Sequence, residues 1–332
     1  MTGASSAQRV RFILLPIMAV YIGVGVSVSL PIGAAPQLIE VGFYNMNGSA
    51  TDVYVREGHA FVAVKYSGLN VIDVTDPQDP RMEGFHDTPD YAAAIDLQGD
   101  YAYIADRAGG LRIFDISDPT TPREAGVYEM PGEAYGVAVL GDYAYVVDRS
   151  WGLRVIDVSN PTDPREVGSC RTPGRAYGLF VSSDYAYVAD GIGGLRVIDV
   201  SDPTEPEEIG SYEIFDLAYD VHVSRGYAFV AYYESGLVII DISDPTEPRE
   251  VSTYDTPGRA LGVYVEGDYA YIADGIKGLR VIDISDPAGP QEVASHDTPD
   301  LAWDVYVAAG YIYVADNESG LRILRLRGAE GG

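Results

Sequence analysis

Three aspartates that share one position of a repeated pattern are the residues most able to do chemistry in this chain. Asp52, Asp220 and Asp304 stand where the other copies carry alanine or glycine, and His222 follows Asp220 by two residues. Grouped carboxylates with a histidine could bind a divalent cation such as calcium, or act as acid and base. A single histidine in a strand is more often a packed residue than a ligand. The pattern therefore predicts a candidate site with no defined catalytic residue, no cofactor and no firm metal ligand.

Other residues that break the repeat lie close to these positions in the pattern, and most of them are acidic or aromatic. They complete the candidate binding set: Lys65, Tyr66, Asp216, Tyr232, Tyr233, Glu234, Asp300 and Trp303. Aromatic rings stack on apolar faces and carboxylates accept hydrogen bonds, so the set suits a cation, a sugar or a peptide. The alternative interpretation is drift, because exposed loops of unequal repeats accumulate differences without selection for binding.

The elements that must position these residues are copies of one 42-residue unit. The sequence GLRVIDVSDPTEP at Gly194–Pro206 has close copies that begin at Gly68, Gly110, Gly152, Gly236 and Gly278. Asp199 and its five equivalents precede an Asp-Pro turn, whereas Arg325 stands in the seventh copy, where that turn is missing. These aspartates are therefore predicted to organise turns rather than to bind metal. Asp190 and its equivalents, which end the YAYVAD run, are also interpreted as turn formers.

Each unit contains four short runs that read as strands. In the fourth unit they are EVGSC from Glu166, AYGLFV from Ala176, YAYVAD from Tyr185 and LRVIDVS from Leu195. Each run alternates β-branched or aromatic residues and is bounded by turn residues, and none supports an amphipathic helix. Four strands in each of seven units predict an all-β fold, a seven-bladed β-propeller of antiparallel blades. An open solenoid is the alternative, but it would need capping units.

The two ends of the repeat array predict how the ring closes. The array begins with EVGFY at Glu40, an outer-strand run, and it finishes with LRILRL from Leu321, a third-strand run. The last blade is therefore expected to be completed by the first strand of the chain, which ties the termini together.

The first 35 residues differ from the repeats. Arg9 and Arg11 are followed by Phe12–Leu30, which contains no charged residue. This segment is predicted to be an export signal or an N-terminal membrane anchor, and residues 36–332 a single propeller. Membrane contact is expected only through this segment, if it is retained. The lone Cys170 excludes an internal disulfide.

The charge balance limits the partners. The formal net charge is −28, with 50 acidic and 22 basic residues apart from histidine. Nucleic acids and anionic lipid surfaces would be repelled by such a protein, so neither is expected as a partner.

The repeated GLRVIDVSDP with YAYVAD before it resembles the LVIVD repeat family of exported β-propeller proteins. The resemblance extends from about Leu38 to Leu326. It implies a propeller outside a bacterial or archaeal cell, either secreted or held at the surface. It implies no catalytic residues, because the family has no defined catalytic set.

Three functions remain open from the sequence. The first is a non-enzymatic scaffold that binds a protein or glycan at the cell surface through its loop-rich face. The second is a hydrolase or lyase acting on a polysaccharide, with His222 and the carboxylates of Asp52, Asp220 and Asp304 as acid, base or metal ligands. The third is a structural component of the cell envelope, in which the acidic residues keep the surface hydrated.

Overall fold

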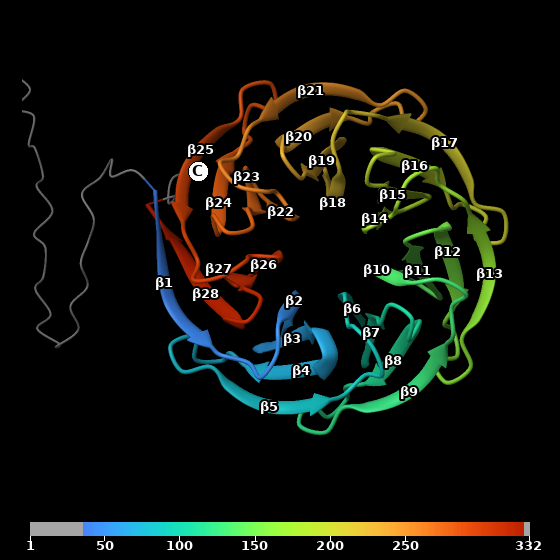
Figure 1. Cartoon of the computed structure of the whole chain (residues 1–332), viewed down its shortest axis with the longest axis horizontal. Coiled ribbons are helices and arrows are strands. Elements are labelled where there is room, and N and C mark those ends of the chain that lie inside the picture. Colours follow the sequence, from blue (N-terminus) through green and yellow to red (C-terminus); the bar gives the residue numbers. More distant parts are fainter. Residues whose placement is uncertain (1–35, 329–332) are drawn as a thin grey trace, which may run out of the picture. The chain divides into compact units, whose positions relative to one another are not determined.

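The repeat units fold into seven four-stranded antiparallel sheets that surround a central channel, a seven-bladed β-propeller (Figure 1). The computed structural model describes residues 36–328. The seven innermost strands are β2 (Ala50–Arg56), β6 (Ala94–Gln98), β10 (Ala134–Leu140), β14 (Gly178–Ser182), β18 (Ala218–Ser224), β22 (Gly262–Glu266) and β26 (Asp304–Ala308). We number the blades 1 to 7 in this order. The sequence-based fold prediction is confirmed.

The other three strands of each blade follow outward from the channel. The second strands are β3 (His59–Val64), β7 (Tyr101–Ala105), β11 (Tyr143–Asp148), β15 (Tyr185–Ala189), β19 (Tyr227–Tyr232), β23 (Tyr269–Ala273) and β27 (Tyr311–Ala315). The third strands are β4 (Gly68–Asp73), β8 (Leu111–Asp115), β12 (Gly152–Asp157), β16 (Leu195–Asp199), β20 (Gly236–Asp241), β24 (Leu279–Asp283) and β28 (Leu321–Arg327). The outer strands are β5 (Arg81–His86), β9 (Arg123–Tyr128), β13 (Arg165–Cys170), β17 (Glu207–Tyr212), β21 (Arg249–Tyr254), β25 (Gln291–His296) and β1 (Gln37–Tyr44). A single turn of 3₁₀-helix, η1 (Lys65–Ser67), links β3 to β4.

The hydrophobic core lies between neighbouring blades. One cluster joins Leu195 and Val197 of blade 4 to Val221 and Val230 of blade 5, and six equivalent clusters complete the ring. The second and third strands are buried on both faces, which explains why they read as nearly continuous apolar runs. No helix within residues 36–328 is long and apolar enough to cross a membrane.

The aspartates at the ends of the third strands organise turns, as the sequence predicts. Asp199 Oδ1 accepts a hydrogen bond of 2.9 Å from the backbone N–H of Ser201. Asp157 Oδ1 accepts bonds from both the N–H and the hydroxyl of Ser159, at 2.9 and 2.7 Å. These bonds favour the charged carboxylate and lower the pKa of both aspartates.

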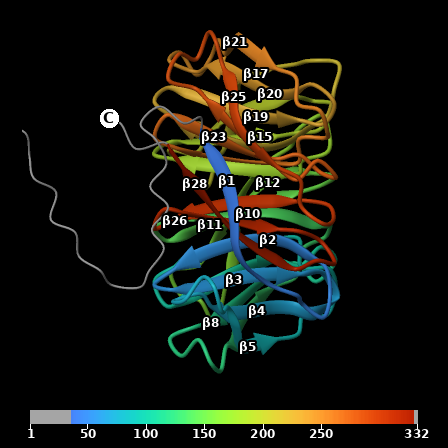
Figure 2. The same cartoon turned by 90° about the vertical axis from the view of Figure 1, so that its left-hand side faces the viewer.

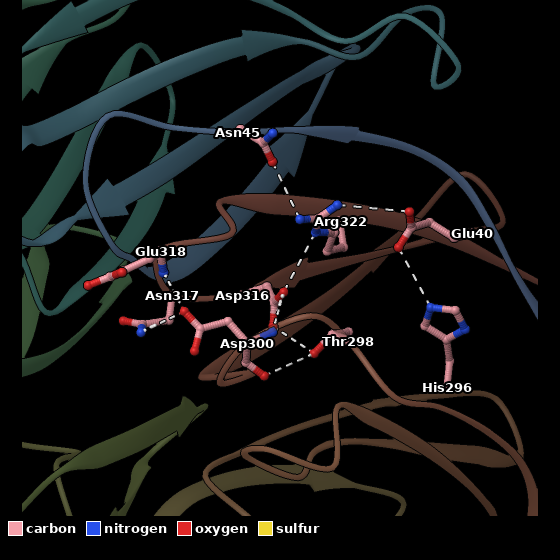
Figure 3. A network of polar contacts seen from close by, with 9 residues as sticks. All are labelled: Glu40, Asn45, His296, Thr298, Asp300, Asp316, Asn317, Glu318 and Arg322. Carbon is pink, nitrogen blue, oxygen red and sulfur yellow. Dashed lines mark hydrogen bonds and ion pairs between the residues drawn. The ribbon is translucent and has the colours of Figure 1, made fainter.

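The aspartates that end the YAYVAD runs do more than form turns, because they are buried. The Asp316 side chain has no exposed surface, accepts a 2.6 Å bond from Thr298 Oγ1 and lies 3.6 Å from Arg322 Nε (Figure 3). Equivalent Asp–Arg contacts pair Asp106 with Arg112, Asp148 with Arg154, Asp190 with Arg196, and Asp274 with Arg280. Blade 5 carries Tyr232 and Val238 in these two places, and blade 1 carries Val64 and Asn70. Aspartate and arginine are thus replaced together in blades 1 and 5. This is expected, because either charged group alone would be buried without a partner.

The ring closes through the first strand, as predicted. β1 pairs antiparallel with β28, from Gln37 opposite Arg327 to Tyr44 opposite Leu321, and Figure 2 shows β1 lying alongside β28. Glu40 also faces His296 of β25 at 3.6 Å and Arg322 at 3.9 Å (Figure 3). Blade 7 is therefore built from both ends of the repeat array.

Removing β1 should weaken the whole ring. Leu38, Val41 and Tyr44 are partly buried against the clusters on either side of blade 7. We expect residues 45–332 to unfold with a free energy lower by on the order of 3–6 kcal/mol than residues 36–332, at about 1–2 kcal/mol for each side chain. Urea unfolding measures the difference. A synthetic peptide of residues 36–44 should restore part of it, and equal stability of the two proteins would contradict the closing role of β1.

Candidate ligand-binding site at the channel mouth

One end of the channel opens into a cavity of about 330 Å³ to which all seven blades contribute. It lies on the face formed by the loops before the inner strands and the loops between the second and third strands, which we call the loop face. The inner strands start at this face, so their first residues surround the cavity. Most residues that break the repeat fall in these same segments.

Aromatic rings form the wall of the cavity over five blades. Tyr135, Tyr177, Tyr219 and Trp303 occupy one position of the repeat, directly before the residues equivalent to Asp52, and Tyr91 comes from the loop before β6. The rings of Tyr177 and Tyr219 are stacked, with centroids 4.6 Å apart and planes at 12°. Burial raises the pKa of Tyr91 and of Tyr219 to about 12, so these phenols remain neutral at physiological pH.

Two arginines lie among these rings. The Arg107 guanidinium carbon lies 3.6 Å from the centroid of Tyr91 and 4.5 Å from that of Tyr135, so the group is held between two rings. Arg149 lies 5.0 Å from the centroid of Tyr135 and donates a 2.9 Å hydrogen bond to its hydroxyl. Each cation–π contact contributes about 0.5–2 kcal/mol. In a strongly acidic protein, part of the cavity wall is therefore cationic.

Backbone pairing with the next blade holds Arg107 at the mouth, whereas the Arg149 N–H bonds the carbonyl of Glu133 in its own blade. The Arg107 N–H and C=O form two 3.0 Å hydrogen bonds with Ala134, the first residue of β10 in the next blade. That alanine is the same in every blade and is fully buried in each, because the loop of the preceding blade covers it. Gly191, Gly275 and Asn317 pair in the same way with the first alanine of the next blade.

Carboxylates form the floor. The Asp52 carboxylate accepts a 2.8 Å hydrogen bond from the N–H of Ile95 on the next inner strand, and Asp220 accepts a 2.9 Å bond from Val263. Asp304 lies 3.4 Å from the Val53 N–H, which continues the pattern across the ring closure. Each carboxylate thus accepts a hydrogen bond from a backbone N–H on the inner strand of the next blade.

Glycines in the preceding blades make room for two of these carboxylates. A Cβ at Gly178 would lie 2.6 Å from Asp220 Oδ1, and one at Gly262 would lie 2.9 Å from Asp304 Oδ1. The order Gly178, Asp220, Gly262 and Asp304 in blades 4 to 7 therefore has a steric reason. A side chain at the glycine would occupy the space of the neighbouring carboxylate.

The floor carboxylates are close enough to repel one another, and burial makes them hold protons. Burial raises the pKa of Asp220 to about 7, and repulsion from Asp52 adds to the shift. Burial, followed by the charge of Asp52, raises the pKa of Asp304 well above its ordinary value. The Asp52 and Asp304 side chains hydrogen-bond each other, which requires one of them to carry a proton. The floor is consequently less negative than its composition suggests.

A layer of packed rings lies along the inner strands, two residues beyond the floor carboxylates. Phe180, His222, Tyr264, Tyr306 and Tyr54 come from five consecutive inner strands, and neighbouring ring centroids lie 4.7–4.9 Å apart. We call these five residues the plug, and none of them lines the cavity. His222 belongs to this layer, where burial lowers its pKa to about 4.

The remaining predicted residues have separate positions. Asp216 accepts hydrogen bonds from the N–H groups of Glu234 and Ser235, and Asp300 accepts them from Asn317 Nδ2 and the Glu318 N–H (Figure 3). These two aspartates therefore hold loops in shape and are not among the residues lining the channel.

The aromatic and cationic members of the predicted set divide between the rim and the interior. Lys65 reaches Asn317 and lies 5.7 Å from the ring centroids of Tyr91 and Trp303. Tyr66 is exposed at the rim, Tyr233 stacks on Tyr219, and Tyr232 is fully buried in the core.

The cationic half of the site was missed from the sequence, although a signal for it exists. Lys65, Arg107, Arg149, Gly191, Tyr233, Gly275 and Asn317 share one repeat position. Of these residues, only Lys65 and Tyr233 belong to the predicted binding set. Comparison of this single column would have shown three successive blades with a cation. Asp96 was missed in the same way, because it replaces a ring of the plug position; burial raises its pKa to about 7.

A preformed group of metal ligands is not found within residues 36–328. In this part of the chain no three histidine, cysteine, aspartate or glutamate side chains are grouped to hold an ion. Asp52, Asp220 and Asp304 converge on the cavity floor, but each bonds backbone N–H groups. Their predicted role in cation binding stays a prediction.

Comparison with known proteins supports the repeat assignment. The model of the LVIVD repeat matches seven segments, at residues 47–88, 89–130, 131–172, 173–214, 217–256, 257–298 and 301–324. The chain belongs to the LVIVD repeat family. No match was found among curated proteins.

Two solved structures share the fold at low sequence identity. The computationally designed protein Ika8 is 8% identical with a TM-score of 0.65, over 86% of this chain and 98% of its own. The WD40 repeats of RRP9 are 11% identical with a TM-score of 0.72, over 89% of this chain and 99% of their own. At this identity the likeness of this LVIVD repeat protein to both concerns the propeller fold alone.

Asp220→Asn should change how stability depends on pH. The amide oxygen can still accept the Val263 N–H, but the titratable group is lost. In the unfolded wild type the Asp220 carboxyl loses its proton near pH 4, roughly. In the folded protein it keeps the proton to about pH 7. The free energy of unfolding therefore falls as the pH rises through this window. We expect the variant to gain stability relative to the wild type between these values, as measured by urea unfolding. Asp199→Asn, in an exposed turn, should show no such change above pH 5, roughly. Parallel curves for Asp220→Asn and the wild type would contradict the raised pKa.

His222→Phe should have the opposite pH signature. In the unfolded protein the His222 imidazole binds a proton near pH 6.5, roughly. Burial in the folded protein lowers this pKa to about 4. The wild type therefore loses stability as the pH falls through this range. Phenylalanine keeps the ring contacts with Phe180 and Tyr264 and cannot titrate. The variant should therefore gain stability relative to the wild type on acidification, in the same urea assay. A gain that does not vary with pH would mean that the imidazole is exposed to water.

Proposed function

We propose that this chain is an exported, non-enzymatic binding protein that holds a protein or glycan partner at the cavity on its loop face. The observation that carries the proposal is that Asp52, Asp220, Trp303 and Asp304, which depart from the repeat, line one concave, aromatic cavity together with Arg107 and Arg149. A scaffold position repeats in every blade, whereas a binding site needs different side chains around its perimeter. The cavity volume falls within the range of small-ligand pockets.

The chemistry of the wall supports binding. Tyrosine, tryptophan and arginine are the side chains that dominate the energy of binding sites, because they bury large surfaces and keep polar tips. All three types line this cavity, as Tyr177, Trp303 and Arg107. The rings are held by their neighbours in the structure, so little conformational entropy is lost when a partner stacks on them.

The geometry favours binding over acid–base catalysis. The Asp52 and Asp220 carboxylates already accept backbone hydrogen bonds. His222 lies in the plug and faces rings rather than the cavity. The residues that would supply an acid and a base are thus committed to the scaffold. Export follows from the charge-free segment Phe12–Leu30, which lies outside the described residues.

Trp303→Ala should weaken partner binding with little effect on the fold. The screen presents printed oligosaccharides and peptides to immobilised protein of residues 36–332. We expect ligands found in this way to bind Trp303→Ala at least about tenfold more weakly, which corresponds to about 1.4 kcal/mol. Trp151→Ala is the matched control, because Trp151 is exposed outside the cavity. If every detected ligand binds both variants as it binds the wild type, the cavity is not the binding site.

A further inference from the structure

We propose that the cavity recognises an oligosaccharide that carries a carboxylate, such as a uronic acid unit, and that Arg107 and Arg149 bind this carboxylate. The inference rests on the binding function proposed above and names the class of its ligand.

Arg107 has hydrogen-bonding capacity that the protein does not use. Its guanidinium is held between the rings of Tyr91 and Tyr135, and its Nε–H is buried without a hydrogen-bond partner among residues 36–328. It also forms no ion pair with any side chain in that part of the chain. A planar guanidinium fixed by two rings presents its N–H groups in a preset fork, which matches the two oxygens of a carboxylate.

Arg149 supplies a second guanidinium next to the same ring. The Arg149 guanidinium also lies over the Tyr135 ring, and its Nη1 lies 3.5 Å from Glu133 Oε2. Its buried Nε–H has no hydrogen-bond partner within residues 36–328. Both arginines line the cavity. Arg149 has one carboxylate neighbour and Arg107 has no ion pair among the described residues, so the two guanidinium groups leave a positive charge that an anionic ligand would neutralise.

The backbone conformation at Arg107 independently indicates a role for its side chain. Its φ is +39°, in the left-handed region, and the equivalent residues of blades 4 and 6 are Gly191 and Gly275, with φ of +56° and +59°. A long side chain in this conformation costs on the order of 1 kcal/mol relative to glycine. Arginine therefore stands where glycine would fit the backbone better, which points to a role for its side chain.

The wall and the floor suit a hydroxyl-rich ring. The Tyr177 and Tyr219 rings offer flat apolar faces on which the C–H face of a sugar can stack. The Trp303 Nε1–H is buried without a partner within the described part of the chain, so it is free to donate. Burial raises the pKa of Asp220 and Asp304, and a carboxyl that holds its proton can both donate and accept hydrogen bonds, as a sugar hydroxyl does.

An extended peptide is a poorer match, because the inner-strand edges are already used. The N–H groups of Val53, Ile95 and Val263 face carboxylates of the preceding blades. Strand addition requires free edge N–H groups along the binding strand. A cationic ligand would in turn meet Arg107 and Arg149 before it reached the floor.

The test measures binding of defined tetrasaccharides to residues 36–332 by isothermal titration calorimetry. The probes are tetramers of galacturonate, mannuronate and guluronate, and the methyl ester of each. We expect at least one acidic tetramer to bind at least tenfold more tightly than its ester, and less tightly as salt is raised. Arg107→Gln and Arg149→Gln should each remove the preference for acid over ester. Arg171→Gln is the matched control, since Arg171 stacks on Trp151 outside the cavity, and it should keep the preference.

The other outcomes separate this inference from the proposed function. If acid and ester bind equally well and both depend on Trp303, the proposed recognition of a carboxylate is wrong, but the cavity is still the binding site. Binding of an acidic tetrapeptide at the cavity, with no sugar bound, would overturn the sugar in the same way. If no probe binds and no screened ligand responds to Trp303→Ala, both proposals fail. Because glutamine at residue 107 could disturb the loop, the acid-to-ester ratio is the deciding readout, which a general loss of structure would leave unchanged.

Discussion

The inner strand of each blade is the edge of a sheet, and its N–H groups face the channel without a strand partner. Unpaired backbone groups in a narrow channel are costly, so the ring must supply other acceptors. Carboxylates of the preceding blade supply several of them, as Asp52 does for Ile95 and Asp96 for Val139. This requirement determines where acidic side chains can lie inside the ring, and the character of the cavity floor follows from it.

The same requirement explains the protonation of the floor. A carboxylate that bonds a strand edge is drawn out of water, and several of them converge because the channel is narrow. Burial and mutual repulsion raise the pKa of Asp220 and Asp304, so the floor behaves as a hydrogen-bonding surface more than as a cluster of negative charge. The packed rings of the plug lie below it, which separates His222 from anything bound in the cavity.

The wall of the cavity depends on a second constraint, the docking of each loop onto the next blade. Arg107 pairs its backbone with Ala134, and the alanine is invariant among the seven repeats because no larger side chain fits under the loop. With the backbone held in this way, the side chain at each loop can change without loss of the fold. Blades 1 and 2 use this freedom for Lys65 and Arg107, and blade 3 carries Arg149 at the same repeat position, where its N–H bonds Glu133 of its own blade.

The sequence by itself determined the repeat length, the four strands of each blade, the number of blades and the closure by β1, because these follow from periodicity and from where the array begins and ends. It also determined the turn role of Asp199 and its equivalents, since that role depends on neighbours two residues away. The partners of Asp190 and Asp220 were decided by the tertiary structure, because Arg196 lies on another strand and Val263 lies in another blade. Curvature of the ring brings Arg107, Tyr135 and Trp303 around one cavity, and contacts of that kind between distant blades leave no trace in local pattern.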